Sequence, residues 1–268
     1  MLKRVITTIV ALPLFIFVIW SGHFTGVLAL LSIWALNEIH EAFGNKNRVL
    51  YAINGLASLV FFFVLRVPIG SDLTVFLFAY ILINLIFMVF NHAKIKPTDV
   101  AINIFGFLYV TIMFSAIYLV RMVESGQYLV WLIFISAWGS DTCAYLVGVP
   151  LGKHKLPQKL RSLSPKKSIQ GCVGGIIGAG VIAVGYAIIA NRFFEISEVD
   201  VLMFGIIGVV GALFSQIGDL ASSAIKRSVG IKDFGRIFPG HGGVIDRFDS
   251  ILFTGPIVYI IIYYFVMG

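Results

Sequence analysis

The stretch IFPGHGGVIDRFDSILF, residues 237–253, gathers acidic, basic and glycine residues immediately before an apolar run. Asp246 and Asp249 are three residues apart, so they share one face if the apolar run is helical. Three glycines precede them: Gly240, Gly242 and Gly243. Glycine permits backbone conformations that are closed to other residues. The spacing of the carboxylates therefore predicts a site for a ligand rather than a packing surface.

A third carboxylate, Asp219, ends a long apolar run and is followed by two hydroxyl groups. Ser222 and Ser223 come three and four residues later, so all three side chains lie on one side of a helix. Asp219, Asp246 and Asp249 together would supply the oxygen ligands that hard divalent cations prefer. We therefore predict a metal site at these three aspartates.

Basic side chains accompany the three aspartates. They are Lys226, Arg227, Lys232, Arg236 and Arg247. Carboxylates that hold a metal, combined with cations that hold phosphate groups, are typical of phosphoryl and nucleotidyl transfer. A charged loop is more commonly a solvated surface, but this one is rich in glycine and enclosed between two apolar segments. We therefore interpret it as part of an active site.

A second basic loop, GKHKLPQKLRSLSPKKSIQG at residues 152–171, ends where a glycine-rich apolar segment begins. Its last part contains Ser164, Lys166, Lys167 and Ser168. A hydroxyl here can cap the next helix, and lysines beside the free N–H groups of a helix start form an anion site. The alternative is a loop that attracts anionic lipid. The Ser-Pro-Lys-Lys-Ser arrangement favours phosphate binding.

Asp141 lies inside an apolar run at residues 128–148. A carboxylate at membrane depth must face a polar cavity or a charged partner. We predict that Asp141 faces a substrate, and the alternative is a structural pairing with a basic residue.

The composition indicates which elements position these residues. Of the 268 residues, 59% are hydrophobic and 12% are charged, whereas soluble domains have about a quarter of their residues charged. Continuous apolar runs predict transmembrane helices rather than the alternating strands of a membrane barrel. We predict an all-α integral membrane protein with about nine transmembrane helices and its catalytic half in the C-terminal spans. The predicted spans are 5–22, 24–43, 50–66, 72–91, 101–120, 128–148, 170–191, 201–222 and 250–267.

Two of these spans have alternatives. The first follows a basic start, as a signal peptide does, but no cleavage site of small residues follows it, so we expect it to be retained. The span at 50–66 is short, and a chain in which it does not cross would have eight spans.

The 20 Lys and Arg residues are unevenly distributed among the loops. With nine spans, all of them lie on one side except Arg66, Arg121 and Arg192. Basic loops remain in the cytoplasm, so we expect a multi-pass protein of the inner cell membrane with its N-terminus and active-site loops cytoplasmic. The net charge of +7 then reflects topology and does not indicate a nucleic-acid partner.

The two halves of the chain differ in character. Residues 1–125 have few polar residues at membrane depth, and we expect these helices to serve packing and self-association. Residues 126–268 carry the two long loops, and we expect them to form the catalytic region. The glycines at 171–185 are expected to let helices pack closely.

Four further residues have reactive side chains, but we expect none of them to take part in the reaction. Glu38 and Glu41 close the second predicted span, where we expect water to solvate them. Cys143 and Cys172 are expected to be free thiols, because disulfides are rare on the cytoplasmic side. Without nearby histidine pairs they would also make a poor zinc site.

Residues 223–249, SAIKRSVGIKDFGRIFPGHGGVIDRFD, resemble the signature of the phosphatidate cytidylyltransferases, also called CDP-diglyceride synthetases. The signature requires Ser, Lys-Arg, Lys-Asp, Pro, His-Gly-Gly and Asp-Arg-x-Asp, and each position is filled at the expected spacing. The motifs from Asp141 to Lys167 are also similar, so the likeness covers about residues 130–253. Ser168 and Gln170 depart from it, because the family usually has Thr and Glu there.

The resemblance implies that CTP reacts with phosphatidic acid to give CDP-diacylglycerol and pyrophosphate. It implies that Asp219 and Asp246 hold a divalent metal, Mg²⁺, with Asp249 supporting them or binding a second cation. It also implies a homodimer in the lipid bilayer. The candidate catalytic residues are Asp219, Asp246, Asp249, Lys226 and Arg227. The candidate substrate-binding residues are Asp141, Ser164, Lys166, Lys167, Ser223, Lys232, His241, Gly242, Gly243 and Arg247.

His241 could act as an acid or a base in this reaction. The attacking phosphate is already an anion and needs no strong base. We therefore expect His241 to contact phosphate or support the loop.

Two other functions fit part of the pattern. A transferase or CTP-dependent kinase acting on a prenyl lipid would share the charged residues, but the full signature favours phosphatidate. A secondary transporter could use Asp141 and Asp219 at membrane depth. The missing internal repeat and the concentration of phosphate-type cations on one side argue against transport.

Overall fold

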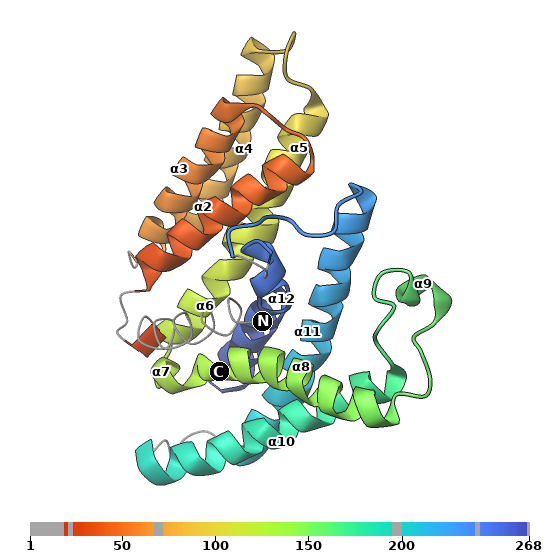
Figure 1. The fold of residues 1–268 in the computed structure, drawn as a ribbon. Coiled ribbons are helices and arrows are strands. Elements are labelled where there is room, and N and C mark those ends of the chain that lie inside the picture. The colour runs from red at the N-terminus through yellow and green to blue at the C-terminus, as the bar shows by residue number, and fades with distance from the viewer. Residues whose placement is uncertain (1–18, 21–23, 67–71, 195–199, 239–241, 267–268) are drawn as a thin grey trace. The chain divides into compact units, whose positions relative to one another are not determined.

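The computed structural model describes residues 19–20, 24–66, 72–194, 200–238 and 242–266, and they are largely helical (Figure 1). The long helices are α2 (Thr25–Ala42), α3 (Arg48–Val64), α4 (Asp72–Phe90), α8 (Trp131–Leu151), α10 (Ile169–Phe194), α11 (Val201–Ser228) and α12 (Ile245–Phe265). A π-helical segment, η1 (Phe107–Ile112), joins α5 (Pro97–Gly106) to α6 (Met113–Met122). The short helices are α7 (Gly126–Leu129) and α9 (Gln158–Arg161).

Among the described residues, six helical stretches are long and apolar enough to cross a membrane. They are Leu73–Phe90, Pro97–Met122, Gly126–Leu151, Ile169–Phe193, Val201–Ser228 and Ile245–Phe265. These stretches identify an all-helical protein of the multi-pass membrane type. The last one begins earlier than the predicted 250–267, so Asp246 and Asp249 are both within the helix.

The nine predicted crossings are not confirmed in the described part of the chain. α2 forms where the second crossing was expected, but polar residues, Asn37, Glu38 and Glu41 among them, occupy its last turns. α3 has 17 residues, fewer than the roughly 20 that a crossing needs. The predicted span 5–22 lies outside the described residues except at Ile19 and Trp20.

The chain forms two compact units. Unit 1 contains the described residues up to 115 together with 231–246, and unit 2 contains 116–230 and those from 247 onward. Part of the signature, 231–246, belongs to the same unit as the N-terminal helices. The predicted functional division after residue 125 stays a prediction.

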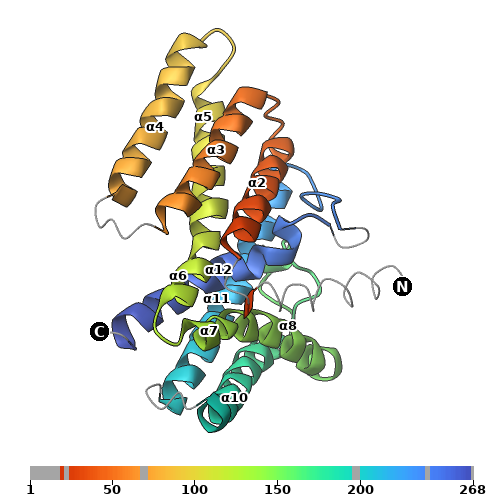
Figure 2. The same ribbon diagram turned by 90° about the vertical axis from the view of Figure 1, so that its left-hand side faces the viewer.

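In unit 1, α2, α3, α4 and α5 lie side by side, as the views in Figures 1 and 2 both show. Their contact faces carry a buried polar network built around Asn103. His40 Nε2 lies 2.7 Å from Asn103 Oδ1, and Asn103 Nδ2 donates to Asn84 Oδ1 at 2.7 Å. Asn54 and Tyr80 donate to the Asn103 carbonyl at 2.9 and 3.1 Å. Five polar side chains of this unit, His40, Asn54, Tyr80, Asn84 and Asn103, therefore form one buried hydrogen-bonded cluster.

In unit 2, α8, α10 and α11 pack against one another, and glycines let them approach closely. A Cβ atom at Gly175 would lie 2.7 Å from the Ser140 carbonyl, and one at Gly178 would overlap the Cys143 side chain. The packing role predicted for the glycine-rich segment is thus confirmed. Cys143 and Cys172 are free thiols, as predicted.

Candidate active site

A pocket of about 320 Å³ lies in unit 2 between α8 and the start of α10. Its polar lining consists of Asp141, Lys166, Lys167, Ser168 and Gln216. Apart from Asp141, the α8 residues of the lining are mostly apolar and include Ala144, Tyr145 and Val149. The volume is within the range of small-molecule sites. A pocket that has both cations and apolar side chains in its lining suits a ligand with an anionic group attached to an apolar part.

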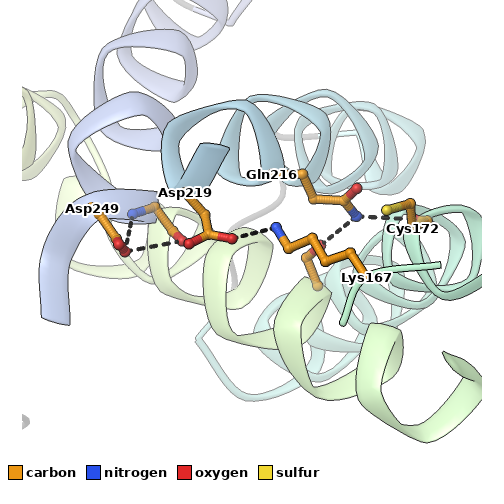
Figure 3. Close-up of polar contacts among 7 residues, drawn as sticks. Lys167, Cys172, Gln216, Asp219 and Asp249 are labelled. Atoms are coloured by element: carbon orange, nitrogen blue, oxygen red, sulfur yellow. Dashed lines mark hydrogen bonds and ion pairs between the residues drawn. The ribbon is translucent and has the colours of Figure 1, made fainter. Parts of the chain in front are cut away.

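Three of the predicted site residues meet beside this pocket. Lys167 forms an ion pair with Asp219, and Asp219 lies between Lys167 and Asp249 (Figure 3). α11 and α12 can approach this closely because a Cβ at Gly218 would lie 2.8 Å from the Asp249 carbonyl. The sequence SQIGD, with glycine next to the aspartate, therefore brings the two carboxylates together.

Carboxylates and lysines interact electrostatically at this place. Asp141, Asp219 and Asp249 are close enough for their charges to interact, and Lys167 and Lys226 attract them. Carboxylates that repel one another near the ends of apolar helices favour binding of a further cation.

Gln216 holds the three helices around the pocket in register, a role that the sequence analysis missed. Its Nε2 donates to Ser140 Oγ on α8 at 3.1 Å and to the Cys172 carbonyl on α10 at 2.9 Å. The available signal was its position three residues before Asp219, on the same face of an otherwise apolar helix.

The loop that carries Lys166 and Lys167 is tied down at both ends. Ser168 Oγ accepts from Gly171 N at 3.2 Å, which is the helix cap predicted for this hydroxyl. Gln170 Nε2 donates to His154 Nδ1 at 2.6 Å, and His154 N donates to Gln170 Oε1 at 3.1 Å. Gln170 therefore braces the loop.

We expect Gln170→Glu to change the turnover rate by less than about tenfold, or 1.4 kcal/mol. Glutamate keeps the acceptor for His154 N and loses only the donor to His154 Nδ1. Turnover of the purified variant at fixed substrate and metal concentrations measures the effect. A gain much larger than tenfold would contradict a bracing role and would mean that a carboxylate at this position takes part in the reaction.

In unit 1, residues 231–238 and 242–244, here called the signature loop, contact the carboxylate of Asp246. Asp246 Oδ2 accepts from Phe234 N at 2.8 Å and from Gly243 N at 2.9 Å. Gly242 has a φ of 85°, which only glycine adopts readily, as the sequence predicted. Asp246 thus joins the two ends of the loop through its carboxylate.

Glu38 contacts the same loop, and the sequence analysis gave it no such role. It is 3% exposed, and its two carboxylate oxygens accept from Val244 N at 2.8 Å and Ile245 N at 3.0 Å. Glu38 lies outside the six candidate spans. Burial raises the pKa of its carboxyl, and the two backbone N–H groups favour the charged form.

The other predicted residues have less distinctive surroundings. Arg227, Lys232 and Arg247 are exposed, and Ser164 and Ser223 are half-buried. Gly240 and His241 lie outside the described residues.

Three or more His, Cys, Asp or Glu side chains do not come together as a ready-made metal cage in the part of the chain that the structure describes. Mg²⁺ does not require one, because proteins usually hold it through one or two carboxylates, with water and substrate phosphates as the other ligands. Asp219 and Asp249 are hard oxygen donors beside phosphate-type lysines. The residues present therefore fit Mg²⁺.

The signature predicts membership of a cytidylyltransferase family, and similarity to known proteins tests that prediction. A model of the Cytidylyltransferase family matches residues 2–265. The chain belongs to the cytidylyltransferase family. This membership makes the protein a nucleotidyltransferase and confirms the predicted class of enzyme.

Individual relatives of this cytidylyltransferase agree. The phosphatidate cytidylyltransferase of Staphylococcus haemolyticus is 31% identical over 97% of this chain and 98% of its own length. Those of Staphylococcus saprophyticus and Staphylococcus aureus are 34% and 32% identical over the same shares. The similarity covers both units, including the helices before residue 130 that the signature did not reach.

Proposed function

We propose that this cytidylyltransferase transfers the cytidylyl group of CTP to phosphatidic acid. The observation that carries the proposal is the Lys167–Asp219 pair, with Asp141 and Asp249 near it, beside a pocket lined by both basic and apolar side chains. One substrate is a lipid and the other is soluble. Their phosphates can meet only where apolar helices end in charged residues.

In the proposed reaction, a phosphate oxygen of phosphatidic acid attacks the α-phosphorus of CTP. A new P–O–P bond forms, and the bond from the α-phosphorus to the oxygen shared with the β-phosphorus breaks. Pyrophosphate leaves with that electron pair, and CDP-diacylglycerol remains. The nucleophile is already an anion, so the reaction needs no strong general base.

The barrier comes largely from bringing two anions together, and the lysines offset it. Lys166 and Lys167 hold one of the phosphate groups in the pocket, and Lys226 acts near Asp249. Holding both substrates in line supplies much of the remaining rate enhancement. The apolar α8 side chains of the pocket, which include Tyr145 and Val149, hold the lipid part of the acceptor.

Asp219 and Asp246 are the proposed ligands of Mg²⁺, and Asp249 supports them or binds a second cation. Asp246 comes one helical turn before Asp249 on α12. When bound, Mg²⁺ would neutralise charge on the reacting phosphates and on the leaving pyrophosphate.

We also propose the topology and assembly that the sequence predicts. Nine crossings with a cytoplasmic N-terminus would place all Lys and Arg residues except Arg66, Arg121 and Arg192 on the cytoplasmic side of the inner membrane. The proposed assembly is a homodimer, for which the apolar helices before residue 126 offer surface.

A turnover assay on the purified protein in detergent tests the function. It supplies labelled CTP, phosphatidic acid and Mg²⁺, with EDTA added in a parallel reaction. We expect lipid-linked label only when both substrates and the metal are present. Folded protein that forms no product would overturn the proposal, and product formed with a prenyl phosphate instead would redirect it to another lipid.

We expect Lys167→Met to lower kcat/KM about 100-fold, because the ammonium group that contacts Asp219 and faces the pocket is lost while the aliphatic stem remains. Steady-state kinetics with both substrates varied measures the loss. Lys159→Met, in the exposed helix α9 of the same loop, is the matched control and should retain normal kinetics. Equal losses in the two variants would mean that the loop acts only through its overall charge.

A further inference from the structure

Two carboxylates accept hydrogen bonds at the start of α12. One is Asp246 of α12 itself, and the other is Glu38 of α2. Three successive N–H groups point to them: Gly243 N to Asp246, and Val244 N and Ile245 N to Glu38. The first N–H groups of a helix have no partners within the helix. A negative charge at this end also interacts favourably with the helix dipole. Glu38, about 200 residues earlier on α2, satisfies both requirements.

The arrangement is a capping box with one member replaced. Asp246 reaches back three residues to Gly243 N, as the acidic member of that motif does. The usual partner is a Ser or Thr side chain at the position that Gly243 occupies, and glycine cannot supply it. Glu38 provides the missing acceptor from another helix.

The Glu38 carboxylate fits against the signature loop because two residues there are glycines without a side chain. A Cβ atom at Gly243 or at Gly235 would overlap it. Glu38 and these two glycines therefore form one interdependent unit. This explains why a capping serine is absent from a helix start whose other features favour one.

We propose that Glu38 is a positioning residue that fixes the first turn of α12 and, through it, the orientation of Asp246. Its action on turnover rests on the proposed function, because it matters only if Asp246 serves the reaction. Its action on the helix start does not depend on any substrate. Glu41, one turn further along α2, is exposed and bonded to Asn37, so it supplies the matched control.

The first arm of the experiment measures hydrogen exchange in peptides that cover residues 242–250, without substrates. In Glu38→Gln, the amide nitrogen faces one of the two N–H groups and cannot accept from it. We expect exchange there to be faster by about 5- to 30-fold, the change that corresponds to losing a helix cap. Glu41→Gln should exchange like the wild-type chain. Unchanged exchange in Glu38→Gln and Glu38→Ala would overturn the proposal.

The second arm measures kinetics on the same proteins. We expect kcat of Glu38→Gln to fall about 10- to 100-fold, as for other groups that orient metal ligands. KM for phosphatidic acid should be nearly constant, and more Mg²⁺ should be needed for half-maximal rate. A purely structural role would instead lower the folded fraction and leave kcat per folded molecule unchanged, which would overturn the proposal.

A double variant, in which one substitution compensates for the other, tests the proposal even if the single variants fold poorly. Gly243→Ser alone should impair the protein, because its Cβ overlaps Glu38. Glu38→Ala with Gly243→Ser restores the ordinary serine cap in the space that Glu38 vacates. We expect this double variant to exceed both single variants in protection from exchange and, by about fivefold or more, in kcat. Additive losses in the double variant would overturn the proposal. If the wild-type chain lacks the proposed activity, the exchange arm still decides the role of Glu38.

Discussion

Asp219→Asn is expected to lower kcat/KM roughly 1,000-fold, or about 4 kcal/mol, while the protein stays folded. Asparagine has nearly the same shape but removes the charge that pairs with Lys167 and that we propose binds Mg²⁺. Folding should persist because Gln216 still joins α8, α10 and α11. Lys167 also keeps a nearby carboxylate in Asp141. Steady-state turnover and a thermal unfolding midpoint on the same preparation measure the two effects.

Glu124→Gln is the matched control for this prediction. It makes the same change from carboxylate to amide at an exposed residue of unit 2, and turnover should be normal. The assignment of Asp219 fails if Asp219→Asn turns over within about threefold of the wild-type chain at saturating Mg²⁺.

Asp246→Asn should lose nearly as much activity, about 100- to 1,000-fold, for a different structural reason. The asparagine oxygen can still accept from Phe234 N and Gly243 N, so the loop should retain its conformation. Only the negative charge is removed. Kinetics and hydrogen exchange over residues 233–246 together measure the outcome.

Comparison with Asp246→Ala separates the two roles of this carboxylate. Alanine removes both the charge and the two hydrogen bonds, so exchange in the loop should quicken as well. Exchange that is equally fast in Asp246→Asn would show that the charge itself holds the loop, and near-normal turnover in Asp246→Asn would remove Asp246 from the metal site.

Much of the candidate site could be predicted because its signals are local in the sequence. Asp219 ends one apolar run, Asp249 comes directly before the next, and the Ser-Pro-Lys-Lys-Ser stretch comes directly before a helix. Because each of these residues stands at the boundary of an apolar run, the sequence places it near the end of a helix and near the membrane surface. Lys167 and Asp219 then meet because glycine-rich segments let their helices approach closely.

The parts that were missed depend on contacts between residues far apart in the chain. Glu38 and Glu41 look alike in sequence, but only Glu38 is turned toward the signature loop. The start of α12 at Ile245 was predicted too late, because the cap that begins the helix comes from α2. The predicted number of crossings was based on hydropathy averaged over each run. The average hides the polar last turns of α2, so it does not show whether that helix crosses the bilayer.

The polar network around Asn103 has a consequence for how the protein is made. His40, Asn54, Tyr80 and Asn84 are all synthesised before Asn103, their shared partner on α5. At about 5–20 residues per second, several seconds separate Asn54 from Asn103. Until α5 is made, the earlier helices can form only the part of the network that joins them to one another, such as the hydrogen bond from Tyr80 to Asn54. We therefore expect α2, α3 and α4 to reach their final packing only once α5 has been synthesised.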